Sequence, residues 1–139
     1  MDELRKIMGL DRGYKVIKIE EGNDGKTKAK YIYVETTKNK CKCPKCDKYT
    51  RSVHDKLKPI TLKYVKAFEF ITYVVLIKRR FICHDCKYKF TESVTIQGEH
   101  KNISNKVEQK ILIDLKKYNL SLKYIAEENN VSDNTVRNM

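Results

Sequence analysis

The sequence has no tryptophan, only two prolines and five glycines, and no long apolar stretch. Its longest run without a charged residue covers residues 70–77, whereas a membrane-spanning helix needs about 20 apolar residues. No apolar run follows the charged residues 2–6, so we expect neither a membrane partner nor a secretory signal. We therefore expect a cytoplasmic protein whose thiols stay reduced.

Acidic residues are scarce relative to basic ones. Lysine and arginine number 30 against 18 aspartates and glutamates, which gives a formal net charge of +12. This excess suits a polyanionic partner, most simply DNA or RNA, although a lysine-rich surface alone would have the same composition. With 40% apolar and 35% charged residues, a fibrous or low-complexity chain is excluded. The 139 residues allow one domain or two small ones, whose small cores would need a metal or disulfides.

Hydrophobic periodicity predicts an α+β fold. Residues 1–10 are predicted to form a short helix that Gly9 ends. Alternating apolar and polar residues at 14–19 and 29–34 predict a β-hairpin that turns at 22–25. Further strands are expected at about residues 50–54, 60–68 and 69–80.

Two cysteine pairs carry the strongest chemical signal. Residues 43–46 and 83–86 are each Cys-x-x-Cys, and 36 residues separate the pairs. This spacing lets both thiolates of a tight turn reach one ion at about 2.3 Å. The sequence therefore predicts one structural zinc ion with four ligands: Cys43, Cys46, Cys83 and Cys86. A closed site has no open coordination position and cannot activate water. No carboxylate triad can be assigned in the sequence, and we expect no catalytic residue and no small-molecule substrate.

Several alternatives stay open for these cysteines. Cys41 could replace Cys43 as a ligand, although the two-residue spacing favours Cys43. Iron in a rubredoxin-like site uses similar turns and would make the chain an electron carrier, against which its basic charge counts. A redox Cys-x-x-Cys would need only one pair. We interpret His54 and His84 as surface or packing residues rather than ligands.

The C-terminal part has a helical period. Apolar residues recur at spacings of four and three at Val107, Ile111, Leu115 and Tyr118, and Asn119 ends the predicted helix. Residues 121–139 have the pattern of a helix-turn-helix, in which Ser121 and Ser132 cap the helices and Asn130 takes the left-handed turn conformation. The inward residues are Leu122, Ile125, Ala126, Val131, Val136 and Met139.

The outward residues of the second short helix are candidate DNA contacts, because a recognition helix presents them to base edges and phosphates. They are Ser132, Asp133, Asn134, Thr135, Arg137 and Asn138. Basic residues of the cysteine-containing part would contact phosphates: Lys45, Lys48, Arg79, Arg80, Lys87 and Lys89. A helical hairpin with a polar face and no DNA contact is the alternative.

These elements divide the chain into four segments. We expect a leader helix and β-hairpin over residues 1–40 and a four-cysteine, zinc-ribbon-like β-module over residues 41–97. A linker over residues 98–103 would precede a small helical helix-turn-helix domain over residues 104–139. The chain stops inside the recognition helix, so we expect it to be the front end of a longer protein.

Taken in order, these parts resemble the N-terminal region of the ISL-three family of bacterial insertion-sequence transposases. The matching stretches are residues 8–10, 43–46, 53–55, 79–86, 90–92 and 125–136. The cysteine pairs and the Phe-Thr-Glu sequence at 90–92 are the most specific of them. The family usually has glycine after the second cysteine of each pair, where this chain has Asp47 and Lys87. Because lysine tolerates a positive φ poorly, we expect the second turn to be looser or differently turned.

The resemblance implies that the chain binds double-stranded DNA at the terminal inverted repeats of an insertion sequence. It also implies that transposition chemistry belongs to a DDE-type carboxylate domain absent from this chain, so the fragment alone would be no enzyme. A homodimer would suit the paired ends of such an element. A zinc-ribbon and helix-turn-helix transcription regulator is the main alternative, and the reading frame beyond residue 139 would distinguish the two.

Overall fold

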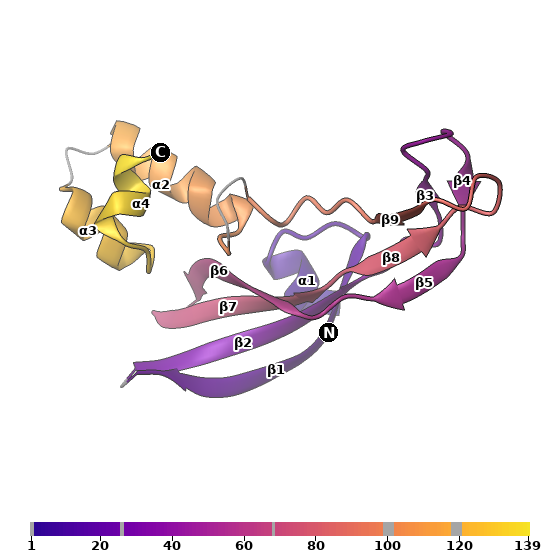
Figure 1. The fold of residues 1–139 in the computed structure, drawn as a ribbon. Helices are drawn as coiled ribbons and strands as arrows, with labels where there is room; N and C mark the ends of the chain where they lie inside the picture. Colours follow the sequence, from indigo (N-terminus) through magenta and orange to yellow (C-terminus); the bar gives the residue numbers. More distant parts are fainter. Residues whose placement is uncertain (1, 26, 68, 99–101, 118–120) are drawn as a thin grey trace. The chain divides into compact units, whose positions relative to one another are not determined.

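The computed structural model describes residues 2–25, 27–67, 69–98, 102–117 and 121–139. In this part of the chain the fold is mixed α+β, as predicted, with most elements being strands (Figure 1). The helices are α1 (Asp2–Ile7), α2 (Asn105–Lys117), α3 (Leu122–Glu128) and α4 (Asp133–Arg137). The strands are β1 (Tyr14–Asp24), β2 (Thr27–Thr36), β3 (Cys41–Lys42), β4 (Tyr49–Thr50), β5 (Val53–Lys56), β6 (Ile60–Ala67), β7 (Phe70–Ile77), β8 (Arg79–Ile82) and β9 (Lys89–Thr91).

The described strands form three sheets. The largest has four strands in the order β1-β2-β7-β6, and β3 pairs with β4 in a two-stranded sheet. The third sheet has the order β5-β8-β9 and is antiparallel throughout. Contacts divide the chain into two compact units. One unit comprises residues 1–18, 32–60 and 75–94, and the other comprises residues 19–31, 61–74 and 95–139.

The predicted β-hairpin is present, but its turn lies further along the chain than expected. Strand β1 continues through Gly22 to Asp24, and Gly25 takes a positive φ of 66°. Gly22 is needed for space rather than for a turn, because a Cβ there would lie 2.7 Å from the ring of Tyr31. A close approach and a turn both favour glycine, so the sequence pattern alone does not distinguish them.

Two other predicted strands are each divided in two. The run at 69–80 becomes β7 and β8, which belong to different sheets and part at Lys78. The run at 50–54 becomes the end of β4 and the start of β5, again in different sheets. Each break separates strands that belong to different sheets. The short strands β4 and β8 then pair with β3 and β9, on either side of a cysteine turn.

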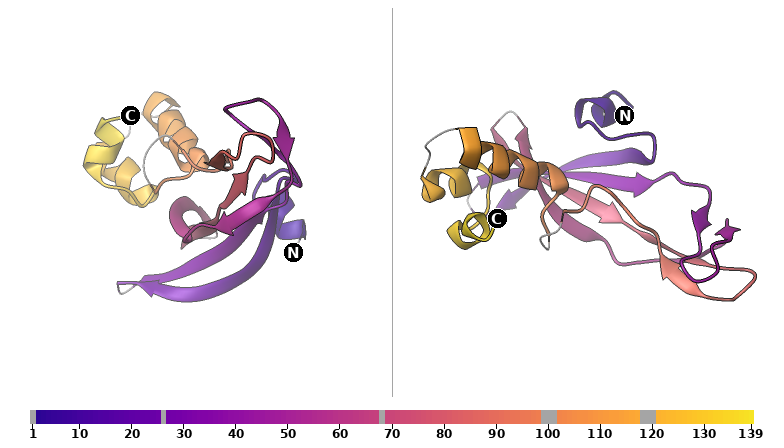
Figure 2. Two further views of the ribbon diagram at one scale, coloured as in Figure 1. Left: turned by 45° about the vertical axis from the view of Figure 1, so that its right-hand side comes forward. Right: turned by 90° about the horizontal axis from the view of Figure 1, so that it is seen from above.

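The C-terminal helices enclose a small apolar core. In the two views of Figure 2 the orange α2 and the yellow α3 and α4 lie side by side. The core cluster consists of Ile103, Val107, Ile111, Ile125, Ala126 and Val136, with Val65, Leu122, Val131 and Met139 packed against it. From α2, Val107 and Ile111 belong to this cluster, whereas Leu115, which continues the same helical period, is 36% exposed. Tyr118 and Asn119 lie outside the described residues.

The predicted caps of the two short helices are confirmed. The Ser121 hydroxyl accepts the backbone N–H of Tyr124 at 3.1 Å, and the Ser132 hydroxyl accepts that of Thr135 at 3.2 Å. These bonds satisfy N–H groups that have no partner inside a helix. Between the helices, Asn130 takes the expected left-handed conformation with a φ of 55°.

Candidate metal centre and nucleic-acid interface

Two tight turns of the same geometry present the paired cysteines. In the first, the N–H of Cys43 donates to the carbonyl of Lys48, and the N–H of Asp47 donates to the carbonyl of Cys43, both at 2.9 Å. The second turn, residues 83–88, repeats the two hydrogen bonds at 2.9 and 3.0 Å. Each turn therefore folds its chain back over the two thiols that it carries.

The residue after the second cysteine is left-handed in both turns. Asp47 and Lys87 each have a φ of 62°, so the expectation of a differently turned second site is wrong. A non-glycine residue in this region costs on the order of 1 kcal/mol. The hydrogen bonds of the turn hold Lys87 in that conformation, and the four thiols can therefore converge.

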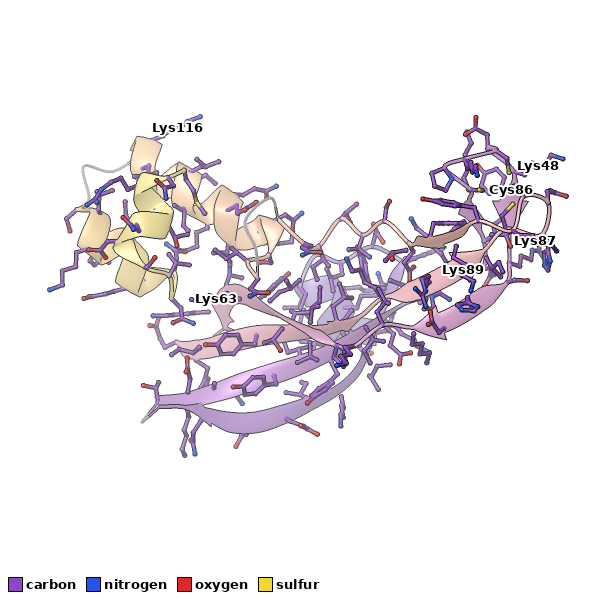
Figure 3. All side chains as sticks on the ribbon, in the orientation of Figure 1. Lys48, Lys63, Cys86, Lys87, Lys89 and Lys116 are labelled. Atoms are coloured by element: carbon purple, nitrogen blue, oxygen red, sulfur yellow. The ribbon has the colours of Figure 1, made fainter. Side chains whose placement is uncertain are left out.

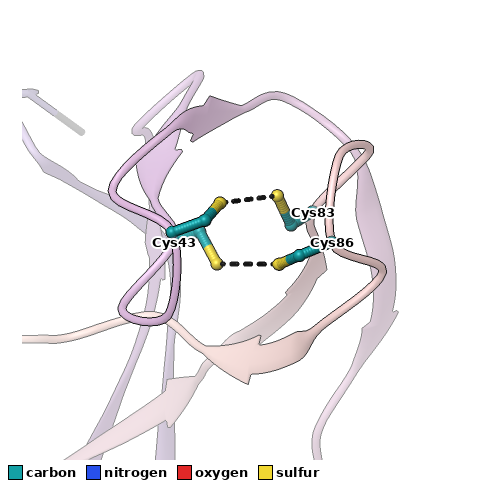
Figure 4. Close-up of side chains that lie close together, drawn as sticks. Cys43, Cys83 and Cys86 are labelled. Carbon is teal, nitrogen blue, oxygen red and sulfur yellow. Dashed lines mark hydrogen bonds between the residues drawn. The ribbon is translucent and has the colours of Figure 1, made fainter.

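The four thiols of these turns meet at one point. The sulfurs of Cys43, Cys46, Cys83 and Cys86 all lie within 4.8 Å of one another. Across the two turns, the sulfurs of Cys43 and Cys86 lie 3.6 Å apart and those of Cys46 and Cys83 lie 3.5 Å apart, and dashed lines join these pairs in Figure 4. A tetrahedral zinc ion with bonds of about 2.3 Å has sulfur–sulfur edges of about 3.8 Å. The residues therefore fit one structural zinc ion.

Backbone N–H groups stabilise the thiolate form of some of these cysteines. The N–H of Cys86 and then that of Asp85 lower the pKa of Cys83 to about 7. For Cys46 the N–H of Lys48 also favours the thiolate, but hydrogen bonding with Cys83 and burial outweigh it and raise the pKa of Cys46 to about 12. A divalent cation would supply the charge that deprotonates the remaining thiols.

The other cysteine and the nearby histidine are not part of this cluster. Among the described residues, the cluster that could hold a metal does not include Cys41, which lies on β3 and is half-buried. Burial raises the pKa of the Cys41 thiol. His84 is exposed, and its Nε2 hydrogen-bonds the hydroxyl of Ser52. This bond links the second cysteine turn to the segment between β4 and β5.

A buried carboxylate follows strand β9. The side chain of Glu92 has no exposed surface and pairs with the guanidinium of Arg79 at 3.1 Å. It also accepts the backbone N–H of Arg79 at 2.7 Å and the hydroxyl of Thr36 at 2.8 Å. A second guanidinium nitrogen of Arg79 donates to the carbonyl of Lys38 at 2.7 Å. A buried charge held in this way is costly to disturb.

The neighbouring arginine has its own carboxylate. Arg80 on β8 makes a two-pronged contact with Asp55 on β5, at 2.9 and 2.5 Å, and the two strands are paired there. The hydrogen bonds from Arg80 hold the pKa of Asp55 below its usual value. Sequence reasoning gave Asp55 and Glu92 no role. The signal was present, because two adjacent arginines and two acids occur in the stretches that carry the resemblance.

The remaining predicted DNA contacts lie on the surface. Four lysines near the cysteine turns are exposed: Lys45, Lys48, Lys87 and Lys89. In Figure 3, Lys48, Lys87 and Lys89 lie at the same end of the strands as Cys86. On and beside α4, Ser132, Asp133, Asn134, Arg137 and Asn138 are exposed and Thr135 is half-buried. Arg79 and Arg80 are instead engaged in the carboxylate pairs described above.

The fold and the sulfur cluster define a small β-module with one structural zinc site. Residues 39–86 match the family model described as the zinc-finger of transposase IS204/IS1001/IS1096/IS1165. The match covers about a third of the chain and contains all four clustered cysteines. This stretch is therefore similar to a transposase zinc finger, and the donor set and the match together support zinc. No curated protein and no solved structure matches the chain.

The matching family model describes a zinc-finger module of a transposase and not a catalytic domain. A match to such a module is consistent with nucleic-acid binding. Among the described residues, no helix has both the length and the apolar character needed to cross a membrane.

Proposed function

We propose that this chain binds DNA as the N-terminal part of a transposase and recognises the terminal inverted repeats of an insertion sequence. One observation carries the proposal: the transposase zinc-finger match and the four clustered sulfurs fall on the same residues. The formal charge of +12 on 139 residues supports a polyanionic partner. The strand-cutting carboxylates would belong to a further part of the protein, and this chain alone would not catalyse transposition.

We assign the sequence-reading role to α3 and α4, acting as a helix-turn-helix. The observations that support this assignment come from the two helices themselves. Both helices are capped, a left-handed Asn130 lies between them, and Val136 packs into their shared core. Because Val136 faces inward, α4 turns its polar residues to solvent, as a recognition helix does. Asn134 would suit an adenine edge and Arg137 a guanine edge.

The zinc module would contribute phosphate contacts through its exposed lysines. Lys45, Lys48, Lys87 and Lys89 suit this role, because they are exposed and lie on or beside the rigid cysteine turns. Arg79 and Arg80 would be weaker candidates for phosphate contacts, since carboxylates of the module already pair with both guanidiniums. Paired element ends would also require two copies of the chain to act together.

The test is fluorescence anisotropy of the zinc-loaded chain at about 0.15 M salt, where exposed charges are well screened. One duplex carries the repeat that flanks the gene, and the second is a shuffled duplex of the same composition. We expect tighter binding to the repeat. Equal, salt-sensitive binding to both duplexes would contradict end recognition, and tight binding only to the promoter of a neighbouring gene would favour a transcription regulator.

A further inference from the structure

Two tyrosines of the zinc module are exposed. Tyr49 is 64% exposed and Tyr88 is 42% exposed. Each follows the second cysteine of its turn, Tyr49 by three residues and Tyr88 by two. A tyrosine ring offers a large flat apolar face with a polar tip, so two exposed rings beside one metal centre form a candidate contact surface.

A lysine lies over each of these rings. The Nζ of Lys40 is 4.9 Å from the ring centroid of Tyr49, and the Nζ of Lys45 is 5.7 Å from that of Tyr88. Both lysines are exposed, so their charges are in contact with solvent. Each ammonium group covers a ring face here, and because both lysine side chains are exposed and flexible, each can leave that face to a base and turn its ammonium group to the phosphate.

The ring of Tyr88 is held in position from behind. It stacks on Phe90 at a centroid distance of 6.4 Å and an interplanar angle of 13°, and Phe90 stacks on Phe81 at 6.1 Å and 20°. Phe81 is fully buried and pairs with Phe90 across β8 and β9. The row of rings thus runs from the core to the surface, and little rotational freedom would be lost when a ligand stacks on Tyr88.

Two hollows flank Pro44 at this surface. One has a volume of about 390 Å³ and is lined by Lys40, Tyr49 and Phe90 among others. The other has a volume of about 380 Å³ and is lined by Pro44, Lys45 and Tyr88. Each hollow therefore combines an aromatic ring with a basic side chain and has room for a flat base.

We propose that this surface binds unpaired nucleotides, with bases stacked on Tyr49 and Tyr88 and phosphates held by Lys40 and Lys45. Bases in an intact duplex already stack on one another, so the rings can be used only where strands are separated, as at a frayed end or a single-stranded tail. The inference deepens the proposed function and rests on it, because it gives the zinc module a preference for an open DNA end.

The experiment compares three probes with the zinc-loaded full chain at about 0.15 M salt: a blunt repeat duplex, the same duplex with a short single-stranded tail, and the tail alone. We expect the tail to strengthen binding by about tenfold or more per ring used, since stacking on an aromatic side chain contributes on this scale. The tail should also quench part of the tyrosine fluorescence, which is readable because the chain has no tryptophan; two of its nine tyrosines belong to the proposed surface.

Variants separate stacking from simple charge. Tyr49→Ala with Tyr88→Ala should abolish the gain from the tail, whereas Tyr49→Phe with Tyr88→Phe should keep it. Tyr124→Ala is the matched control, because that tyrosine is 51% exposed on α3. Zinc content is measured for each variant to show that the module is intact.

The outcomes are distinct for the two proposals. Equal affinity for blunt and tailed duplexes, without quenching, would overturn the stacking surface even where the repeat is still recognised. A gain from the tail that survives the double alanine variant would overturn it as well. A tail-dependent gain without repeat recognition would support the stacking surface while end recognition fails.

Discussion

Glu92 shows how one residue can matter without touching a ligand. Its carboxylate is buried, and its partners are a guanidinium, a backbone N–H and a hydroxyl. The sequence marks Glu92 only as part of a Phe-Thr-Glu stretch. Its pairing with Arg79 could not be read from spacing, because it depends on how β9 pairs with β8.

Glu92→Gln should destabilise the chain by about 2–3 kcal/mol. The substitution keeps the size of the side chain but leaves the Arg79 guanidinium without its buried countercharge. Chemical denaturation of the zinc-loaded protein measures the effect. The matched control is Glu21→Gln, which breaks an exposed pair with Lys30 and should change stability little. Equal effects of the two substitutions would contradict a structural role for Glu92.

Cys43→Ser should release the zinc ion and unfold the module around the cysteine turns, because metal binding and folding are coupled there. Cys41→Ser should keep zinc, since the Cys41 thiol lies outside the sulfur cluster. Bound zinc per chain and far-UV circular dichroism measure both effects. A Cys43→Ser protein that retains zinc and its fold would mean that Cys41 had taken over as a ligand.

At the scale of elements, the helix caps and the pairing of the first hairpin could be predicted, but the points at which strands change sheets could not. The Ser121 and Ser132 caps and the left-handed Asn130 follow from what their side chains can do within a few residues. The splitting of residues 69–80 into β7 and β8 depends instead on which distant strands are available to pair. A continuous run of β-branched and aromatic residues does not specify where a strand changes partners.

Arg137→Ala tests the role of α4. We expect binding to the cognate repeat to weaken by about 1–3 kcal/mol, with a smaller loss on shuffled DNA, if the guanidinium reads a guanine. Lys123→Ala removes an exposed charge from α3 and should weaken binding to both duplexes alike. Anisotropy titrations of both variants give the comparison. A uniform loss with Arg137→Ala would make it a phosphate contact.

The pH dependence of metal binding is set by the cysteine turns. Ligand thiols must lose their protons, and the pKa of Cys46 near 12 means that zinc has to displace a proton that this thiol holds firmly at neutral pH. Because binding releases protons, zinc affinity should rise with pH between about 6 and 8. Competition with a chromophoric chelator measures it. An affinity that is flat over this range would contradict thiolate ligation.

Taken as a whole molecule, the chain combines a large positive charge with two compact units. The charge of +12 follows from the composition, and the structural metal site could be predicted from the spacing of the cysteines. The exposed tyrosines beside the metal could not, since exposure depends on packing. The division into four segments and the homodimer stay predictions.

Salt dependence tests the electrostatic part of DNA binding. If about six phosphates are engaged, the association constant should fall with about the fifth power of the salt concentration. Replacing Lys48 and Lys87 together with alanine should lower that exponent by about two, because each lysine would neutralise one phosphate. An exponent unchanged by this double substitution would show that the lysines around the cysteine turns do not bind phosphates.

Hydroxyl-radical footprinting tests the central claim most directly. The target is a long duplex with the terminal repeat embedded in unrelated sequence, bound by the zinc-loaded chain. We predict protection that is confined to the repeat and that disappears when zinc is chelated, because the zinc module and the helices would act on the same site. Uniform weak protection along the duplex, or none, would contradict end recognition.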